Sequence, residues 1–287
     1  MLVKEYENAQ TFLSDYEKLL LEKEAVSQLI LYTAYQAMKS SESEKGLFGA
    51  VLEEEQTILL FCNVLPHNLI IHVVTQEDVS LACVALADFL VARHISITGI
   101  NARLEACQSF MEQYKKHINC TFAMKLGMDV MEIRKINDIK PVEGFQRLAL
   151  PEEAKLVADW MIQFQIEALT SELDYEAALN KATKLIEENK IYLYENSEQK
   201  VVTMAIASRK LVNGMAITYV FTPEENRGMG YAAANMYYLS KNLLDRGYEF
   251  CTLFVDKKNP LSNRAYEKVG YKILEDNYEY KVIQAEA

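Results

Sequence analysis

A short glycine-bearing loop at residues 227–232 is the part of the sequence best suited to hold an anionic ligand. It reads Arg-Gly-Met-Gly-Tyr-Ala, follows a strand-like run that ends at Thr222, and leads into a helix expected from Tyr231. Successive backbone N–H groups of this loop can converge on phosphate oxygens, because two positions lack a Cβ and the positive end of the helix lies behind them. Arg227 adds a charge-assisted contact. The loop therefore predicts a phosphate or diphosphate site built mainly from main-chain groups.

The same loop also satisfies the dinucleotide fingerprint, as Gly228-x-Gly230-x-x-Ala233, and Asp256 ends the next strand where a ribose-binding carboxylate is expected. Two observations oppose this alternative. Five residues separate Thr222 from the first glycine, whereas the fingerprint places that glycine at the end of the strand. In addition, residues 257–287 are too few for the βα units that a dinucleotide-binding domain still needs. A nicotinamide-dependent oxidoreductase would therefore lack most of its cofactor domain.

A second segment places uncharged polar residues on one face of a short helix. Asn259 is the expected N-cap, and Pro260 occupies the first helical position, where proline is favoured. At 3.6 residues per turn the polar face is formed by Asn259, Ser262, Asn263 and Tyr266. A face that is polar, uncharged and carries a tyrosine suits a ligand-facing surface better than a solvated one.

Taken together, R-x-x-G-x-A from Arg227 and N-P-x-S-N-x-x-Y-x-x-x-G-Y from Asn259 resemble the two cofactor-side motifs of the GNAT superfamily of N-acyltransferases. They occur in the family's order, with a helix and a strand between them. The resemblance covers roughly residues 146–282 and is strongest to predicted bacterial acetyltransferases. It implies an α/β fold with a mixed sheet flanked by helices, and transfer of an acetyl group from acetyl-CoA to a primary amine.

The resemblance also assigns the residues that would bind coenzyme A. The diphosphate would lie against Arg227, Gly228, Met229, Gly230, Tyr231 and Ala232. The pantetheine amides would pair with the backbone of Val220, Phe221 and Thr222, which requires the sheet to open beside the strand at 250–256. Asn259, Ser262 and Tyr266 would also contact the cofactor; Asn259 would hydrogen-bond the pantetheine or the acceptor as well as capping its helix, with capping alone as the alternative.

Two residues are expected to take part in proton transfer. Tyr266 matches the family tyrosine that protonates the departing thiolate, and a phenol of pKa ~10 can give a proton to a thiol of pKa ~8.5 at modest cost; a tyrosine that only caps the core is the alternative. Family members often carry a glutamate on the strand before the loop, but this strand reads GMAITYVFT. Glu167 is the candidate base, with Tyr219, a water chain or a plain surface role for Glu167 as alternatives. A non-catalytic acyl-CoA sensor is the alternative function.

The composition limits the classes of partner that the protein is expected to bind. The chain has 287 residues, 50% hydrophobic and 25% charged, with a formal net charge of −11, which is typical of a globular protein. The absence of a basic patch counts against nucleic acid and anionic membranes as partners, and leaves a small-molecule or peptide amine as the expected acceptor. The oligomeric state is open.

The cysteines and histidines predict neither a disulfide framework nor a metal site. The five cysteines are scattered without a C-x-x-C pair, the four histidines show no paired-ligand spacing, and Cys251 is expected to be buried in a strand. No export signal or membrane span is indicated, so the cytoplasm is the expected location.

The order of predicted elements is the same in both halves. The first half reads as two helices in the first forty residues, three strands within 46–74, a helix at 78–94, a strand at 95–97, a helix at 104–117 and a strand at 120–133. The second reads as helices at 151–169 and 175–188, strands at 191–195, 201–208 and 215–222, a helix at 231–246, a strand at 250–256, a helix at 260–269 and a hairpin at 271–274 and 278–282. A degenerate tandem duplication and two unrelated α/β modules both explain this order.

The best domain boundary lies in the charged segment with Pro141 and Gly144, which divides the chain into domains 1–140 and 141–287. The second domain is expected to be the GNAT N-acyltransferase. The first is expected to be GNAT-like but non-catalytic, because its corresponding helix opens with Glu77 and Asp78, which repel a diphosphate. It would cover the sheet edge and shape the acceptor side.

Overall fold

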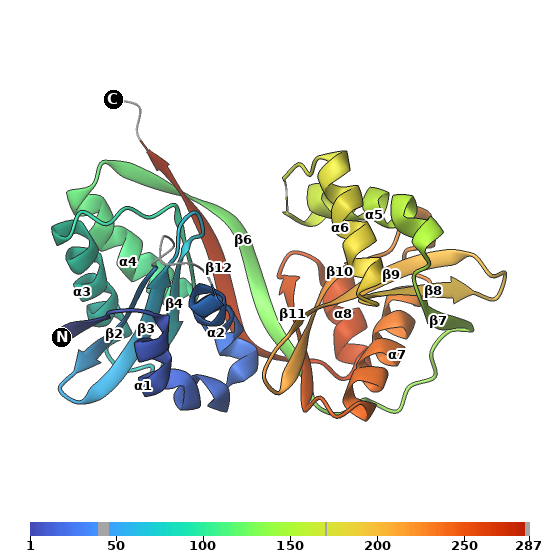
Figure 1. Ribbon diagram of the computed structural model, residues 1–287, viewed down its shortest axis with the longest axis horizontal. Helices are drawn as coiled ribbons and strands as arrows, with labels where there is room; N and C mark the ends of the chain where they lie inside the picture. Colours follow the sequence, from blue (N-terminus) through green and yellow to red (C-terminus); the bar gives the residue numbers. More distant parts are fainter. Residues whose placement is uncertain (40–45, 170, 285–287) are drawn as a thin grey trace. The chain divides into compact units, whose positions relative to one another are not determined.

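The computed structural model describes residues 1–39, 46–169 and 171–284 (Figure 1). It divides into two compact units. The first unit comprises residues 1–128 together with the end of the chain from Glu275, and the second comprises residues 129–274. The observed division therefore lies before the predicted boundary at residue 140, and it assigns the last strand of the sequence to the first unit.

The first unit is a mixed sheet with helices on both faces. Its elements are β1 (Leu2–Tyr6), α1 (Ala9–Glu22), α2 (Glu24–Lys39), β2 (Leu47–Glu53), β3 (Gln56–Asn63), β4 (Leu69–Val73), α3 (Val79–Ala92), β5 (Gly99–Ala102), α4 (Leu104–His117), most of β6 (Cys120–Ile133) and most of β12 (Lys272–Gln284). The strand order is β1-β2-β3-β4-β5-β12-β6. Strands β1 to β4 are antiparallel neighbours, β5 is parallel to β4, and β12 is antiparallel to β5.

Strand β3 shows why the first sheet needs helices on both sides. Leu60 and Cys62 pack into the core under α1 and α2, whereas Leu59 and Phe61 pack into the core under α3 and α4. All four side chains are fully buried. Because successive residues of a strand point to opposite faces, an unbroken apolar run predicts a strand covered on both sides.

The second unit repeats this arrangement. Its elements are the end of β6, β7 (Gly144–Leu148), the short 3-10 helix η2 (Pro151–Glu153), α5 (Ala154–Leu169), α6 (Tyr175–Glu187), β8 (Ile191–Asn196), β9 (Val201–Lys210), β10 (Gly214–Phe221), η3 (Glu224–Asn226), α7 (Tyr231–Asp245), β11 (Phe250–Asp256), α8 (Pro260–Val269) and the start of β12. The strand order is β6-β11-β10-β9-β8-β7. Helices α5 and α6 cover one face of this sheet, and α7 and α8 cover the other (Figure 1).

Each half of the sequence thus carries strand, two helices, three strands, helix, strand, helix and strand, in that order, with the last strand of the second half, β12, lying mostly in the first unit. This confirms the predicted fold class, an α/β protein with two halves of the same element order. The largest differences from the sequence expectation are β1 and β7, which were not predicted. Both lie at the outer ends of the strand orders, and only Tyr6 of their ten residues is buried, so neither has an apolar pattern to reveal it.

Two further strand predictions were wrong. The short strand expected at 95–97 lies at β5, four residues further on. The final hairpin is instead a single strand, β12, which pairs with β5 from Tyr278 to Lys281. Arg103 lies 4.0 Å from Glu275 and 3.5 Å from Asp276, two of the polar residues taken for a turn.

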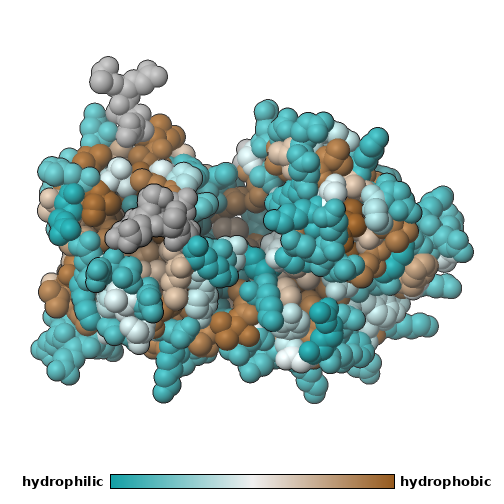
Figure 2. Space-filling model, viewed as in Figure 1, coloured by the Kyte–Doolittle hydropathy of each residue, from teal (hydrophilic) through white to brown (hydrophobic). Residues whose placement is uncertain are grey.

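Hydrophilic residues are spread over the face of the molecule shown in Figure 2, in keeping with the acidic composition. Among the helices that the structure describes, none is long and apolar enough to cross a membrane.

Candidate functional site

The centre of the candidate site is the place where two parallel strands stop pairing. Strand β10 pairs with β11 only from Gly214 to Ala216, opposite Phe250 to Thr252. Both strands continue beyond this point, to Phe221 and Asp256, without further pairing between them. The sheet therefore opens beside β11, as the predicted binding of pantetheine by Val220, Phe221 and Thr222 requires.

The free part of β10 is distorted at Tyr219. This residue has φ +49°, a left-handed conformation that is uncommon for a bulky side chain. The pairing of β10 with β9 shifts register between Thr218 and Phe221, so Tyr219 lies in a β-bulge. Bulges re-aim side chains and are frequent next to active sites.

The glycine loop follows directly and opens helix α7. Gly228 and Gly230 have φ +76° and +85°, and Gly230 is the N-cap of the helix. The first helical hydrogen bond runs from the Ala234 N–H to the Gly230 carbonyl, so the N–H groups of Tyr231, Ala232 and Ala233 have no partner within the helix. A Cβ built on Gly228 would meet nothing within 4 Å. The loop thus offers open space, unpaired N–H donors and the positive end of a helix in one place.

Arg227 and Glu167, predicted for different roles, lie against each other. The Arg227 Nη2 atom is 2.6 Å from Glu167 Oε2, and its Nε donates to the Thr222 carbonyl at 2.9 Å. Both side chains are partly exposed, at 38% and 48%. Arg227 is therefore folded back toward β10 and α5, and the end of α5 is tied to the glycine loop.

The predicted cap of α8 is confirmed. Asn259 Oδ1 accepts a hydrogen bond from the Ser262 N–H at 3.1 Å, and Pro260 is the first helical residue. Asp256, the ribose-binding candidate of the dinucleotide interpretation, instead accepts the Lys258 N–H with its side chain at 2.8 Å and the Asn259 N–H with its carbonyl at 3.0 Å. Asp256 therefore shapes the turn into α8.

Tyr266 is buried, with 6% of its surface exposed, in the core cluster under α7 and α8. Its ring centroid lies 5.9 Å from that of Tyr271. Burial raises the pKa of Tyr266 above the ordinary value, and a hydrogen bond with the Ser262 side chain acts in the opposite direction. A phenol is protonated at neutral pH even at its ordinary pKa of about 10, as a general acid must be, and the upward shift makes proton transfer to a thiolate less favourable than for a free phenol.

Asn263 is a residue of the polar face that the sequence analysis did not single out for binding. Its Nδ2 atom donates to the Asp256 carbonyl at 3.4 Å, and its Oδ1 atom is buried without a hydrogen-bond partner among the described residues. A buried amide oxygen without a partner is costly, so a side-chain movement that brought this atom to a ligand donor would recover a hydrogen bond. The sequence signal that could have singled out Asn263 is its position on the polar face of α8.

Cys251 shows no sign of being a nucleophile. It is fully buried in β11, and burial raises the pKa of its thiol to about 12. The packing role expected from the sequence is confirmed.

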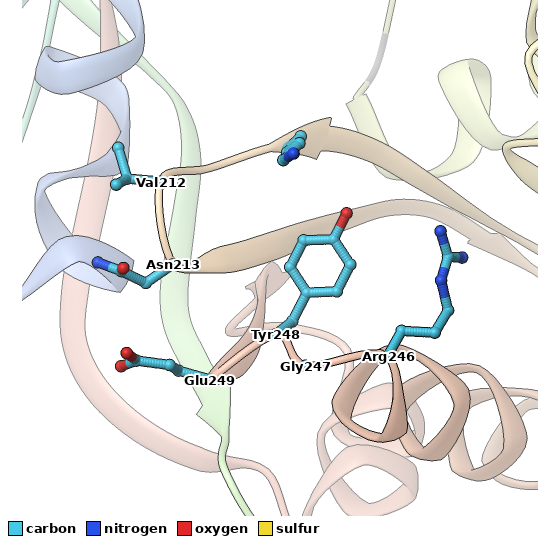
Figure 3. A pocket seen from close by; sticks show the side chains of 7 residues that line it. Val212, Asn213, Arg246, Gly247, Tyr248 and Glu249 are labelled. Atoms are coloured by element: carbon cyan, nitrogen blue, oxygen red, sulfur yellow. The ribbon is translucent and has the colours of Figure 1, made fainter.

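A separate cavity of about 340 Å³ lies elsewhere in the second unit (Figure 3). It is lined by Lys210, Val212, Asn213, Arg246, Gly247, Tyr248 and Glu249. These residues belong to the β9–β10 turn and to the segment between α7 and β11, so the cavity lies at the start of β10, whereas the glycine loop follows its end. None of the predicted site residues lines it, and the geometry of the candidate site does not depend on it.

Comparisons with known proteins agree with the fold and the motifs. Residues 154–271 match the model of the acetyltransferase (GNAT) family. The second half therefore carries a GNAT domain, and the resemblance inferred from the two motifs is confirmed there. No curated protein matches the sequence.

Solved structures extend the likeness to the whole chain. A GNAT-family acetyltransferase from Colwellia psychrerythraea has 13% identity and a TM-score of 0.54, with 99% of this chain and 100% of that chain covered. A GCN5-related N-acetyltransferase from Sphaerobacter thermophilus has 15% identity and a TM-score of 0.56, with 88% and 87% covered. A tandem GNAT protein from the clavulanic acid biosynthesis pathway has 8% identity and a TM-score of 0.50, with 100% and 99% covered. At these identities the likeness concerns the fold, which consists of two GNAT-like halves.

Proposed function

We propose that the second unit is an N-acetyltransferase that moves an acetyl group from acetyl-CoA to a primary amine. The observation that carries this proposal is the parting of β10 and β11 after Ala216 and Thr252, directly before a loop whose N–H groups are unpaired. The parted strands leave backbone groups of β10 for an extended amide chain, and the loop suits a diphosphate.

The residues present fit coenzyme A. The N–H groups from Gly228 to Ala232 would hold the diphosphate, and the open space at Gly228 lets it approach the main chain. The backbone of Val220, Phe221 and Thr222 would hold the pantetheine, with Asn259, Ser262 and the Asn263 amide oxygen on the facing helix. Bound there, acetyl-CoA supplies an activated acyl group as a thioester.

The chain's own residues manage the protons. In the reaction a C–N bond forms to the amine, the C–S bond breaks, the amine loses one proton and the thiolate gains one. Tyr266 Oη would donate the proton to sulfur, since a phenol is protonated at neutral pH. The described strand β10 has no carboxylate to receive the proton from the amine.

Glu167 is the proposed base, and its ion pair with Arg227 suggests when it acts. In its present position Arg227 gives its Nη2 to Glu167 and its Nε to the Thr222 carbonyl, so only part of the guanidinium is left for a diphosphate. Cofactor binding would draw Arg227 toward the diphosphate and release Glu167 to accept a proton, directly or through water. Binding of the cofactor would then precede base catalysis.

Calorimetry followed by an amine screen tests the proposal. We expect one equivalent of acetyl-CoA to bind, and at least one primary amine to give thiol release together with a mass increase of one acetyl group. Binding without turnover of any amine would favour the acyl-CoA sensor. Absence of binding would contradict both.

A further inference from the structure

A row of hydrogen bonds crosses the α5 and α6 face of the second unit and ends on the bulge of β10. The Lys181 Nζ atom donates to the Tyr219 hydroxyl at 3.0 Å, and that hydroxyl donates to Gln165 Oε1 at 3.3 Å. Gln165 Nε2 in turn donates to Ser171 Oγ at 2.9 Å. Helix α5, helix α6, the connection between them and strand β10 thus supply one polar cluster, defined here as Lys181, Tyr219, Gln165 and Ser171.

The position of this cluster depends on a strained backbone conformation at Tyr219. Tyr219 has a left-handed backbone, and its ring packs on Phe164 with centroids 4.8 Å apart. Left-handed geometry in a tyrosine is held only where surrounding contacts impose it, and such strain gathers at functional sites. Tyr219 immediately precedes Val220, the first residue proposed to pair with the pantetheine, so the cluster lies beside the reacting end of the site.

Lys181 is a cation that lacks an acidic partner. Among the residues described, no Asp or Glu lies within ion-pair distance of its Nζ atom, whose contacts are the Tyr219 hydroxyl at 3.0 Å and the Tyr219 ring, with 4.6 Å to the ring centroid. Since this one hydrogen bond uses one of the three ammonium donors, two donors stay available. The side chain is exposed, so an incoming group can reach it.

We propose that the amine acceptor carries a carboxylate, and that Lys181, oriented by Tyr219, binds it. This inference rests on the proposed acetyltransferase activity and names the acceptor class, an amino acid or a compound with an equivalent acid group. Gln165 and Ser171 hold Tyr219 in place and so act as positioning residues.

Three matched acceptors test the inference: an amino acid, its carboxamide and its decarboxylated amine. The wild-type protein is expected to prefer the amino acid by at least about tenfold in kcat/KM, the size typical of one charge-assisted hydrogen bond. In Lys181→Met the preference for the amino acid over the carboxamide should fall at least tenfold, through KM rather than kcat. Lys184→Met, one turn further along α6, is the control and should keep the preference.

The outcomes separate this inference from the proposed function. Turnover of carboxylate-free amines at least as fast as the amino acid, or an unchanged preference in Lys181→Met, overturns the carboxylate assignment and leaves the acetyltransferase standing. Failure of every acceptor to be acetylated overturns both. Tyr219→Phe keeps the ring and removes the hydroxyl; it should raise KM for the amino acid about two- to fivefold, and an unchanged KM would contradict the orienting role.

Discussion

The N-termini of helices α3 and α7, called the helix mouths below, occupy equivalent positions in the two units. Both helices follow the third meander strand of their unit, and both have an N-cap residue in the left-handed conformation: Asp78 at φ +54° and Gly230 at φ +85°. The backbone turn is thus shared, but the α3 mouth carries two carboxylates, Glu77 and Asp78. It is also reached by the short segment 74–78, whereas 222–230 leads to α7. If α7 binds the diphosphate as proposed, the charge and the short connection at α3 are expected to prevent binding there.

The last helix of each unit extends the comparison. Tyr266 is the seventh residue of α8, and the seventh residue of α4 is Phe110, which is fully buried. The first unit thus keeps an aromatic core residue but lacks the hydroxyl. The most direct test of this comparison is to place residues of the first unit at the corresponding positions of the second unit.

Tyr266→Phe is expected to have the largest effect. Removing the general acid should lower kcat by about 10²- to 10⁴-fold while the Kd for acetyl-CoA stays within twofold. Rates of thiol release and calorimetric titration measure the two quantities. Tyr271→Phe, which removes another buried hydroxyl, bonded to Ser240 at 2.8 Å, is the control. A kcat reduction below threefold in Tyr266→Phe would assign this residue to packing alone.

Gly230→Asp should come next, because it gives α7 the N-cap residue of α3. A carboxylate ~4 Å from a phosphate charge costs about 1–4 kcal/mol between water-like and protein-like dielectric constants, so acetyl-CoA should bind about 5- to 1,000-fold more weakly. Calorimetry gives the Kd. Gly230→Asn has nearly the same shape and the same contact of its Cβ with Val142, and isolates the charge.

The reverse substitutions in the first unit test whether charge or loop length prevents acetyl-CoA from binding at α3. Glu77→Gln combined with Asp78→Gly removes the carboxylates from the α3 mouth but leaves the short connection. The stoichiometry of acetyl-CoA binding should stay at one. A second binding site in this double variant would show that charge, without loop length, decides.

Arg147→Met tests how much the side-chain contacts of the outer strand β7 contribute to the stability of the protein. In β7, Arg147 makes two 2.7 Å contacts to Glu153, whereas β1 is tied to α1 by Lys4 and Tyr6 on the exposed Asp15. Loss of the partly buried Arg147 contacts should destabilise the protein by about 1–3 kcal/mol at neutral pH. Denaturant unfolding measures the change.

The pH dependence follows from Glu153. Hydrogen bonding to Arg147 lowers the pKa of this carboxyl in the folded protein, so its contribution is present above the unfolded value near 4.5 and is lost as pH falls through the lower folded value. The difference in stability between wild type and Arg147→Met should therefore shrink below about pH 4.5. Lys200→Met, from an exposed pair with Glu198, should leave the unfolding midpoint unchanged. A difference independent of pH would contradict the role of Glu153.

Glu167→Gln should have the smallest effect on cofactor affinity. Arg227 would no longer have to leave an ion pair to reach the diphosphate, and an exposed pair is worth about 0.2–1 kcal/mol, so acetyl-CoA should bind up to about fivefold more tightly. Turnover should fall, because the proposed base is lost. The neighbouring Glu172→Gln is the control. Weaker binding in Glu167→Gln would contradict competition for Arg227.

The sequence predicted the ends of an element most accurately where capping residues mark them. Helix α8 begins and ends as expected because Asn259 and Pro260 cap one end and Gly270 the other. Strands β1 and β7 were missed because edge strands bury few side chains. The Arg227–Glu167 pair could not be predicted, since the two residues are 60 positions apart and meet only through the fold. The Lys181–Tyr219 contact depends on a bulge, which no spacing rule reveals.

The path of β12 has a consequence for biosynthesis. The neighbour of β5 in the first unit is made of residues from Glu275 onward, so the first half leaves the ribosome with one strand edge unpaired. At ~5–20 residues per second, synthesis of the intervening second unit leaves that edge open for roughly 8–30 s. An open strand edge invites pairing with other chains, so nascent chains stalled before residue 275 should depend on chaperones more than the finished protein does.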